Sequence, residues 1–281
     1  RVRASLNAVS EISHLKNRLH SDVPVHVSQQ IRLGYATTDF PVSTCHVLDL
    51  LVDGERTYEA IFAAIRAAKN HVHLESYIYE PDKIGTALRD LLIEKARAGV
   101  AVRLLVDALG AALLKEKFLA PLRNAGAEVA FFHPTRLRIR PVWNMRTHRK
   151  IVVCDGKVGF TGGINITDSE DERTRPDAYH DTHLQLEGAA VRWLQMIFVE
   201  DWFYTTGKTL GGDALLPHIA PGPYAVQIIP SGPDSEWEAI HRAYISAIER
   251  GTHRIWLTTP YFVPGEAALM ARRRGTVEQP R

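Results

Sequence analysis

Apolar positions recur along this chain with two alternating spacings, one typical of helices and the other typical of strands. Tyr58, Ile61 and Ile65 repeat at intervals of three and four, as on one face of a helix. Residues 100–107 form an almost continuous apolar run, which is typical of a strand in a sheet covered on both faces. The alternation of strands and helices predicts an α/β fold with a mixed or parallel sheet flanked by helices. The predicted strands are 45–52, 72–79, 100–107, 128–132 and 182–186, and the predicted helices are 58–68, 84–98, 113–125 and 189–204.

A stretch rich in glycine and proline divides the chain. Residues 205–223 have no strong apolar period and form the predicted linker. Beyond it, the helix and strand pattern of 60–81 returns at 243–264, which indicates an internal duplication. The predicted domains are an N-terminal segment (1–44) with a short helix and loops, a complete first lobe (45–204), the linker (205–223) and the start of an incomplete second lobe (224–281).

Composition narrows the class of protein. The 281 residues carry 34 basic and 32 acidic side chains, and a formal net charge of +2 is too small to indicate nucleic-acid binding by itself. Cys45 and Cys154 are too few for a disulfide framework and have no partner at metal-ligand spacing, so a reducing environment is expected. No apolar window approaches the roughly 18 residues of a membrane span. Because the first residue is Arg1, we expect upstream sequence to be missing and leave an N-terminal anchor open.

The candidate chemistry is concentrated in one motif, His-x-Lys followed by four residues, Asp, six residues and Gly-Gly-x-Asn. On an extended backbone His148 and Lys150 project to the same face, which pairs a nucleophile with a phosphate-binding cation. Gly163 permits close approach of the backbone, and Asn165 adds a neutral donor for phosphate oxygens. Asp155 completes the catalytic motif, although its position before a turn favours a role in tying the backbone together. A bare His-x-Lys would usually be a solvated strand face, but the full pattern is far more specific.

Several blocks around this motif resemble those of the phospholipase D superfamily, and within it the bacterial cardiolipin synthases. The similarity covers residues 45 to 275. The resemblance implies a phospholipase D-like fold with a pseudo-twofold pair of α/β lobes, each of which donates one motif to a shared active site. The similar blocks are 102–107, 144–151, 159–166, 180–188 and 259–264.

The resemblance also implies a mechanism without a metal or other cofactor. One histidine becomes phosphorylated to form a phosphatidyl-enzyme, while the histidine of the other lobe protonates the leaving alcohol and deprotonates the incoming one. By position, His148 would be the nucleophile, with Lys150 and Asn165 binding phosphate. Asp181 would orient the His148 ring, unless it is a solvated acid at the end of a strand. The implied activity is transfer of a phosphatidyl group to phosphatidylglycerol at the cytoplasmic face of the bacterial inner membrane.

Other polar and aromatic residues have two interpretations each. Glu75 resembles a residue near the cleft floor of the family, or it makes a structural hydrogen bond. The basic run 136–140 favours anionic lipid heads, or it is an ordinary solvated face. Four aromatic residues either line a lipid tunnel or belong to the core: Tyr77, Tyr79, Tyr261 and Phe262. Four histidines are expected at strand ends or with satisfied hydrogen bonds: His71, His73, His180 and His183.

The chain departs from the two-lobed pattern because it contains a single His-x-Lys-x4-Asp motif. A second motif, and with it the general acid, is absent, and Pro280 stands where an apolar strand is expected. Three explanations stay open: an N-terminal fragment of a longer enzyme, which we favour; a homodimer in which two copies of His148 face each other; or a non-catalytic lipid-binding remnant. A rival activity is phosphodiester hydrolysis of phospholipid or nucleic acid.

Overall fold

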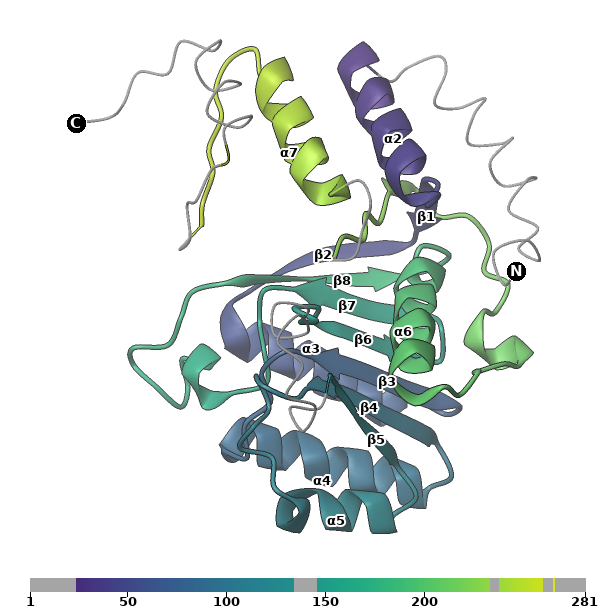
Figure 1. Cartoon of the computed structure of the whole chain (residues 1–281), viewed down its shortest axis with the longest axis vertical. Helices are drawn as coiled ribbons and strands as arrows, with labels where there is room; N and C mark the ends of the chain where they lie inside the picture. Colours follow the sequence, from purple (N-terminus) through teal and green to yellow (C-terminus); the bar gives the residue numbers. More distant parts are fainter. Residues whose placement is uncertain (1–23, 134–145, 233–237, 260–264, 266–281) are drawn as a thin grey trace. The chain divides into compact units, whose positions relative to one another are not determined.

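A mixed β-sheet forms the centre of the larger of two compact units. The computed structural model describes residues 24–133, 146–232, 238–259 and 265, and it divides into a larger compact unit, Ser43–Val226, and a smaller one formed by the flanking segments. In the described part of the larger unit, seven strands follow the order β2-β8-β7-β6-β3-β4-β5 (Figure 1). The strands are β2 (Val47–Val52), β3 (His71–Ser76), β4 (Ala101–Asp107), β5 (Glu128–Phe132), β6 (Ile151–Cys154), β7 (Val158–Gly162) and β8 (Thr182–Glu187).

The sheet combines parallel and antiparallel pairs. β3 pairs in parallel with β4, and β4 with β5, whereas the neighbours from β2 through β6 to β3 are antiparallel. The parallel pairs require crossover helices, which the sequence places between these strands. The predicted α/β class with a mixed sheet flanked by helices is confirmed.

Helices cover both faces of this sheet. Leu104 belongs to the core on the side of α3, α4 and α5, whereas its neighbour Leu105 packs with Phe198 and Trp202 of α6. Since successive residues of a strand point to opposite faces, α6 lies on the other face of the sheet. The helices are α3 (Asp53–Ala67), α4 (Lys83–Arg97), α5 (Glu116–Asn124) and α6 (Val191–Thr206).

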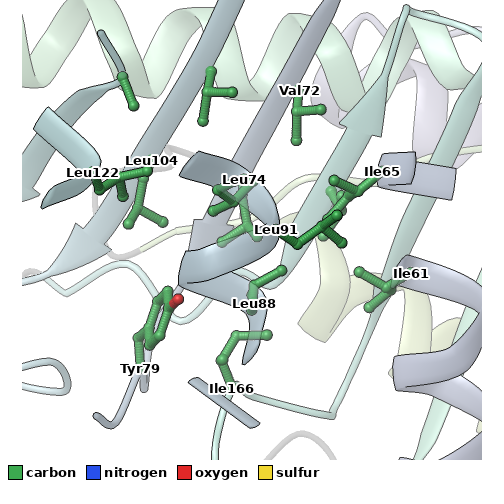
Figure 2. Packing of buried hydrophobic residues seen from close by; sticks show 14 of the residues in the cluster. Ile61, Ile65, Val72, Leu74, Tyr79, Leu88, Leu91, Leu104, Leu122 and Ile166 are labelled. Carbon is green, nitrogen blue, oxygen red and sulfur yellow. The ribbon is translucent and has the colours of Figure 1, made fainter. Parts of the chain in front are cut away.

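The core on this first face lies between the sheet and the layer of α3, α4 and α5. Figure 2 shows Leu74 and Leu104 of the strands close to Leu88 and Leu91 of α4. Leu74 is 1% exposed and Leu88 is fully buried. Burying a leucine side chain completely contributes about 1.5–3 kcal/mol, so this layer supplies much of the free energy that holds the motif strands in place.

Several element boundaries differ from the predicted ones, and two of them do so for reasons outside the local sequence. α3 begins at Asp53, ahead of the predicted start at 58, because the Glu172 carboxylate accepts hydrogen bonds from the backbone N–H groups of Gly54 and Glu55. The predicted strand 45–52 is split at His46. Its first part, β1 (Ser43–Cys45), pairs with β9 (Tyr224–Val226), and its second part pairs with β8.

The smaller unit contains two helices in its described residues, α2 (Val25–Thr38) and α7 (Ala239–Arg250). The side-chain amide of Gln30 donates to the carbonyl oxygen of Ala243 at 2.7 Å and joins them. Residues 255–259, the described part of a predicted strand, have no regular secondary structure, and 260–264 lie outside the described residues. The division into a linker and a second lobe stays a prediction. None of the helices described is both long and apolar enough to cross a membrane.

Leu74→Ala is expected to lower the free energy of unfolding by about 2–5 kcal/mol, because it leaves a cavity between β3 and α4. Leu50→Ala is the matched control, since Leu50 lies on β2 and is 57% exposed. Its effect should stay below about 0.5 kcal/mol. Denaturant unfolding of both variants measures the difference, and equal losses would contradict the proposed layering.

Candidate active site

His148 and Lys150 lie on a short irregular segment, residues 146–150, that leads into β6. The His148 side chain is exposed, whereas Lys150 is only 6% exposed. The Nζ atom of Lys150 is 2.9 Å from the carbonyl oxygen of His148 and 3.2 Å from its Nδ1. The Tyr77 ring lies against the imidazole, with 4.6 Å between the ring centroids. The structure therefore brings the predicted nucleophile and the predicted phosphate-binding cation into direct contact.

The charge states of these two side chains follow from burial and from each other. Burial and the neighbouring Lys150 ammonium lower the pKa of His148, while the Asp107 carboxylate acts in the opposite direction. Burial lowers the pKa of Lys150 to about 8, against the opposing effect of Glu170 and Asp181. At neutral pH the imidazole is neutral and the ammonium is charged, as nucleophilic attack on a phosphodiester requires.

Asn165 is held by a carboxylate that the sequence analysis did not single out. Its Nδ2 donates to Glu170 Oε1 at 2.7 Å, and its backbone N–H donates to Glu170 Oε2 at 2.8 Å. Its Oδ1 accepts from the backbone N–H of Ile78 at 3.1 Å. Because Nδ2 carries two hydrogens, one remains for a phosphate oxygen. Glu170 lies in a 3₁₀ turn, Asp168–Glu170, and the linear pattern contains no signal for its role.

Asp181 lies beside Gly163 rather than in hydrogen-bond contact with the imidazole. A Cβ atom at Gly163 would come within 2.2 Å of both Asp181 carboxylate oxygens, so this carboxylate occupies the space that the glycine leaves. In the part of the chain that the structure describes, no hydrogen bond joins Asp181 to His148. Its charge acts on Lys150, and the orienting role for His148 stays a prediction.

Asp155 lies at the other end of β6, away from the exposed imidazole. Its carboxylate accepts hydrogen bonds from the backbone N–H groups of Lys69, Asn70 and His71, at 2.7–2.9 Å. Burial by itself would raise the pKa of Asp155, but these three donors lower it below its ordinary value. This geometry supports the backbone role over the catalytic one.

The four other histidines that the sequence analysis named lie in different environments. His71 and His73 share the side-chain amide of Gln195, as expected for satisfied histidines, and exposed His180 lies 3.1 Å from Asp53 Oδ2. His183 lies at the start of β8, as expected for a histidine at a strand end, and its Nδ1 is buried without a hydrogen-bond partner among the described residues. Burial, followed by the Lys150 charge, lowers its pKa to about 4.

The aromatic residues also divide between the two interpretations. Tyr77 touches the predicted nucleophile His148, whereas Tyr79 is fully buried and donates its hydroxyl to the Gly85 carbonyl oxygen at 2.8 Å. Tyr261, Phe262 and the basic run 136–140 lie outside the described residues. In the described ranges, no group of three or more metal-binding side chains comes together.

Comparison with known proteins identifies the family. Residues 61–202 match the family described as "Cardiolipin synthase, PLD-like domain". The chain belongs to the phospholipase D superfamily, in its cardiolipin synthase-like branch. This family domain contains all the motif residues discussed above, and the resemblance expected from the sequence is confirmed.

The relatives that match this chain are longer proteins named cardiolipin synthase. The chain is 43% identical over 251 residues to the cardiolipin synthase of Geobacillus kaustophilus and 39% identical over 265 residues to cardiolipin synthase 2 of Bacillus anthracis. These matches cover 88% and 92% of this chain but only 50% of either relative, so the chain spans about half their length. A solved phosphatidylserine synthase of Haemophilus influenzae has a similar fold, with a TM-score of 0.54 at 14% identity, covering 78% of this chain and 57% of that one.

Asp155→Asn is expected to lower the free energy of unfolding by about 1–3 kcal/mol at pH 7, because the amide cannot accept all three backbone hydrogen bonds. The pKa of Asp155 is lower in the folded state, so the stabilisation is present above the ordinary pKa and is lost as the pH falls through the folded value. The difference between wild type and variant should therefore hold from about pH 5 to 8 and shrink below about pH 4. Thermal unfolding across this range measures it.

Asp177→Asn is the control for this prediction, since Asp177 forms an exposed ion pair with Arg175 and its loss should leave the unfolding midpoint unchanged. If the Asp155→Asn variant has normal stability but has lost its catalytic activity, Asp155 takes part in the reaction instead.

Proposed function

We propose that this chain carries the nucleophilic lobe of a cardiolipin synthase-like phosphatidyltransferase. The observation that carries this proposal is the contact between an exposed, neutral imidazole and a buried, charged ammonium, His148 and Lys150. A phosphodiester is an anion that resists attack, and a cation beside the nucleophile offsets the charge that develops in the transition state. The likeness to proteins named cardiolipin synthase supports phospholipids as the substrate class.

The first step forms a bond between the imidazole Nε2 and phosphorus, and the bond from phosphorus to the glycerol oxygen of phosphatidylglycerol breaks. For Nε2 to attack, the ring proton must reside on Nδ1, the atom that Lys150 faces in the substrate-free geometry. An entering phosphate attracts the ammonium, and the movement of Lys150 toward it releases Nδ1. Asn165 Nδ2 then donates to a second phosphate oxygen.

The second step transfers the phosphatidyl group from His148 to the hydroxyl of another phosphatidylglycerol. The departing glycerol takes up a proton and the incoming hydroxyl gives one up, so a general acid and base must face His148. We assign this role to a second lobe, supplied by the other half of a longer chain or by a second copy of this one. The substrates place the reaction at a membrane surface, and we propose the cytoplasmic face of the bacterial inner membrane.

A phosphatidyl ester of p-nitrophenol tests the first step without a second lobe, because its leaving group departs as a phenolate and needs no general acid. We expect one equivalent of p-nitrophenolate per chain, together with a phosphatidyl adduct on the peptide that contains His148. His148→Gln should abolish both signals. His218→Gln, at an exposed histidine, should change neither.

A folded wild-type chain that gives no release would contradict the proposed nucleophile. The fate of the adduct separates the activities once phosphatidylglycerol vesicles are added. Cardiolipin supports transfer, and phosphatidic acid supports hydrolysis instead. Vesicle binding without an adduct would indicate a lipid-binding protein.

The rate of this release should depend on pH through both site residues. His148 attacks only when neutral, and its pKa is lowered, so the rate should rise with a midpoint below about pH 6.5. The ammonium of Lys150 is lost as the pH rises through about 8, so the rate should fall there. The Lys150→Arg variant should react more slowly, but because arginine keeps its charge, its rate should no longer fall above about pH 8. If the rate of that variant still falls at the same pH, the fall is due to the titration of another group.

A further inference from the structure

The backbone that carries His148 receives little support from the sheet. Residues 146–150 precede β6 and have no regular secondary structure, so no strand ladder determines the position of the nucleophile. Side chains on either side of His148 provide the support instead. Thr147 donates its hydroxyl to Glu75 Oε1, and Arg149 forms an ion pair with Asp201.

The partners of these side chains lie on the face of the sheet that α6 covers. Leu74 belongs to the core under α4, so its neighbour Glu75 points to the opposite face. Asp201 is a residue of α6, which packs on β3, β5, β6 and β7 (Figure 1). Thr147 and Arg149 alternate with His148 and Lys150 along the chain. The contacts that Thr147 makes with Glu75 and Arg149 makes with Asp201 therefore reach the segment from the side opposite to the candidate site.

Glu75 is an unusual residue for this position because an acidic residue is only 1% exposed there. Burial, and then the nearby charge of Asp201, raise the pKa of Glu75 well above its ordinary value, which favours the protonated acid. No N–H or O–H group of the described residues reaches Glu75 Oε2. Because Asp201 lies near enough to raise this pKa, a proton on Glu75 Oε2 would be shared with the Asp201 carboxylate, which stays ionised and pairs with Arg149.

We propose that Glu75 is a positioning residue for His148, which it holds through Thr147 on one side and through Asp201 and Arg149 on the other. It touches neither substrate nor imidazole and acts as a neutral acid that accepts one hydrogen bond and donates another. This proposal concerns the geometry of His148, and only its kinetic consequence rests on the proposed function.

The test uses a conservative variant that reproduces the protonated acid. In Glu75→Gln, Oε1 accepts from Thr147 and Nε2 donates to Asp201, so the network persists. Glu75→Leu removes both hydrogen bonds, and Thr147→Val removes one with almost no change of shape. Thr206→Val is the control, because it deletes a hydroxyl that bonds the Trp202 carbonyl oxygen at the end of the same helix.

The first readout is the His148 imidazole resonance in the whole chain labelled with ¹³C-histidine, assigned with His148→Gln. Glu75→Gln and Thr206→Val should keep its chemical shift and titration midpoint, while Glu75→Leu and Thr147→Val should move both. The second readout is p-nitrophenolate release, which should fall by about 10- to 100-fold in the two disruptive variants, as for a small displacement of a reacting group.

Two outcomes would overturn the proposal. If Glu75→Gln disturbs His148 as much as Glu75→Leu does, the negative charge and not the shared proton is what matters. If Thr147→Val leaves the His148 resonance unchanged, the network does not position the ring; this variant also decides the question if Glu75→Leu fails to fold. Absence of p-nitrophenolate release in wild type would count against the proposed function alone, since the resonance readout is independent of turnover.

Discussion

The buried ammonium group of Lys150 is the interaction on which the arrangement of the site depends. Moving a charge out of water is unfavourable unless other groups replace the lost hydration. The carbonyl oxygen and Nδ1 of His148 accept hydrogen bonds from this ammonium, and Glu170 and Asp181 supply opposite charge. Burial still lowers its pKa to about 8, and the same cation helps to keep His148 neutral. One buried charge therefore suits both the phosphate binding and the nucleophilic attack that we propose.

Carboxyl groups make contacts of different kinds at the two ends of the short strand β6. At one end, Asp155 accepts three backbone hydrogen bonds and joins the β6–β7 turn to the start of β3. At the other end, Glu75 and Asp201 contact the residues on either side of the nucleophile. Because β6 pairs with β3 and β7, the sheet holds the strand itself, whereas the segment that carries His148 precedes the strand and is contacted by these side chains.

Much of the fold followed from periodicity, and the exceptions have identifiable causes. The β5 strand and the helix α6 lie where their patterns place them, because the half-buried apolar residues of β5 pack against the cores on both faces of the sheet and the apolar residues of α6 are largely buried. The early start of α3 was missed, since the cap comes from Glu172, far along the chain. Glu170 was missed for a related reason: an acid in a polar turn looks solvated until the fold closes over Asn165.

The sequence by itself determined the fold class, the family and the pairing of His148 with Lys150. Residues two apart on an extended chain share a face whatever surrounds them, so this contact is a property of local geometry. Only the tertiary structure decided that Lys150 is buried, that Asp181 lies beside Gly163 and acts on Lys150, and that Glu75 contacts Thr147. Desolvation and the neighbours of a charge depend on which strands and helices pack together, and no local pattern in the chain contains that information.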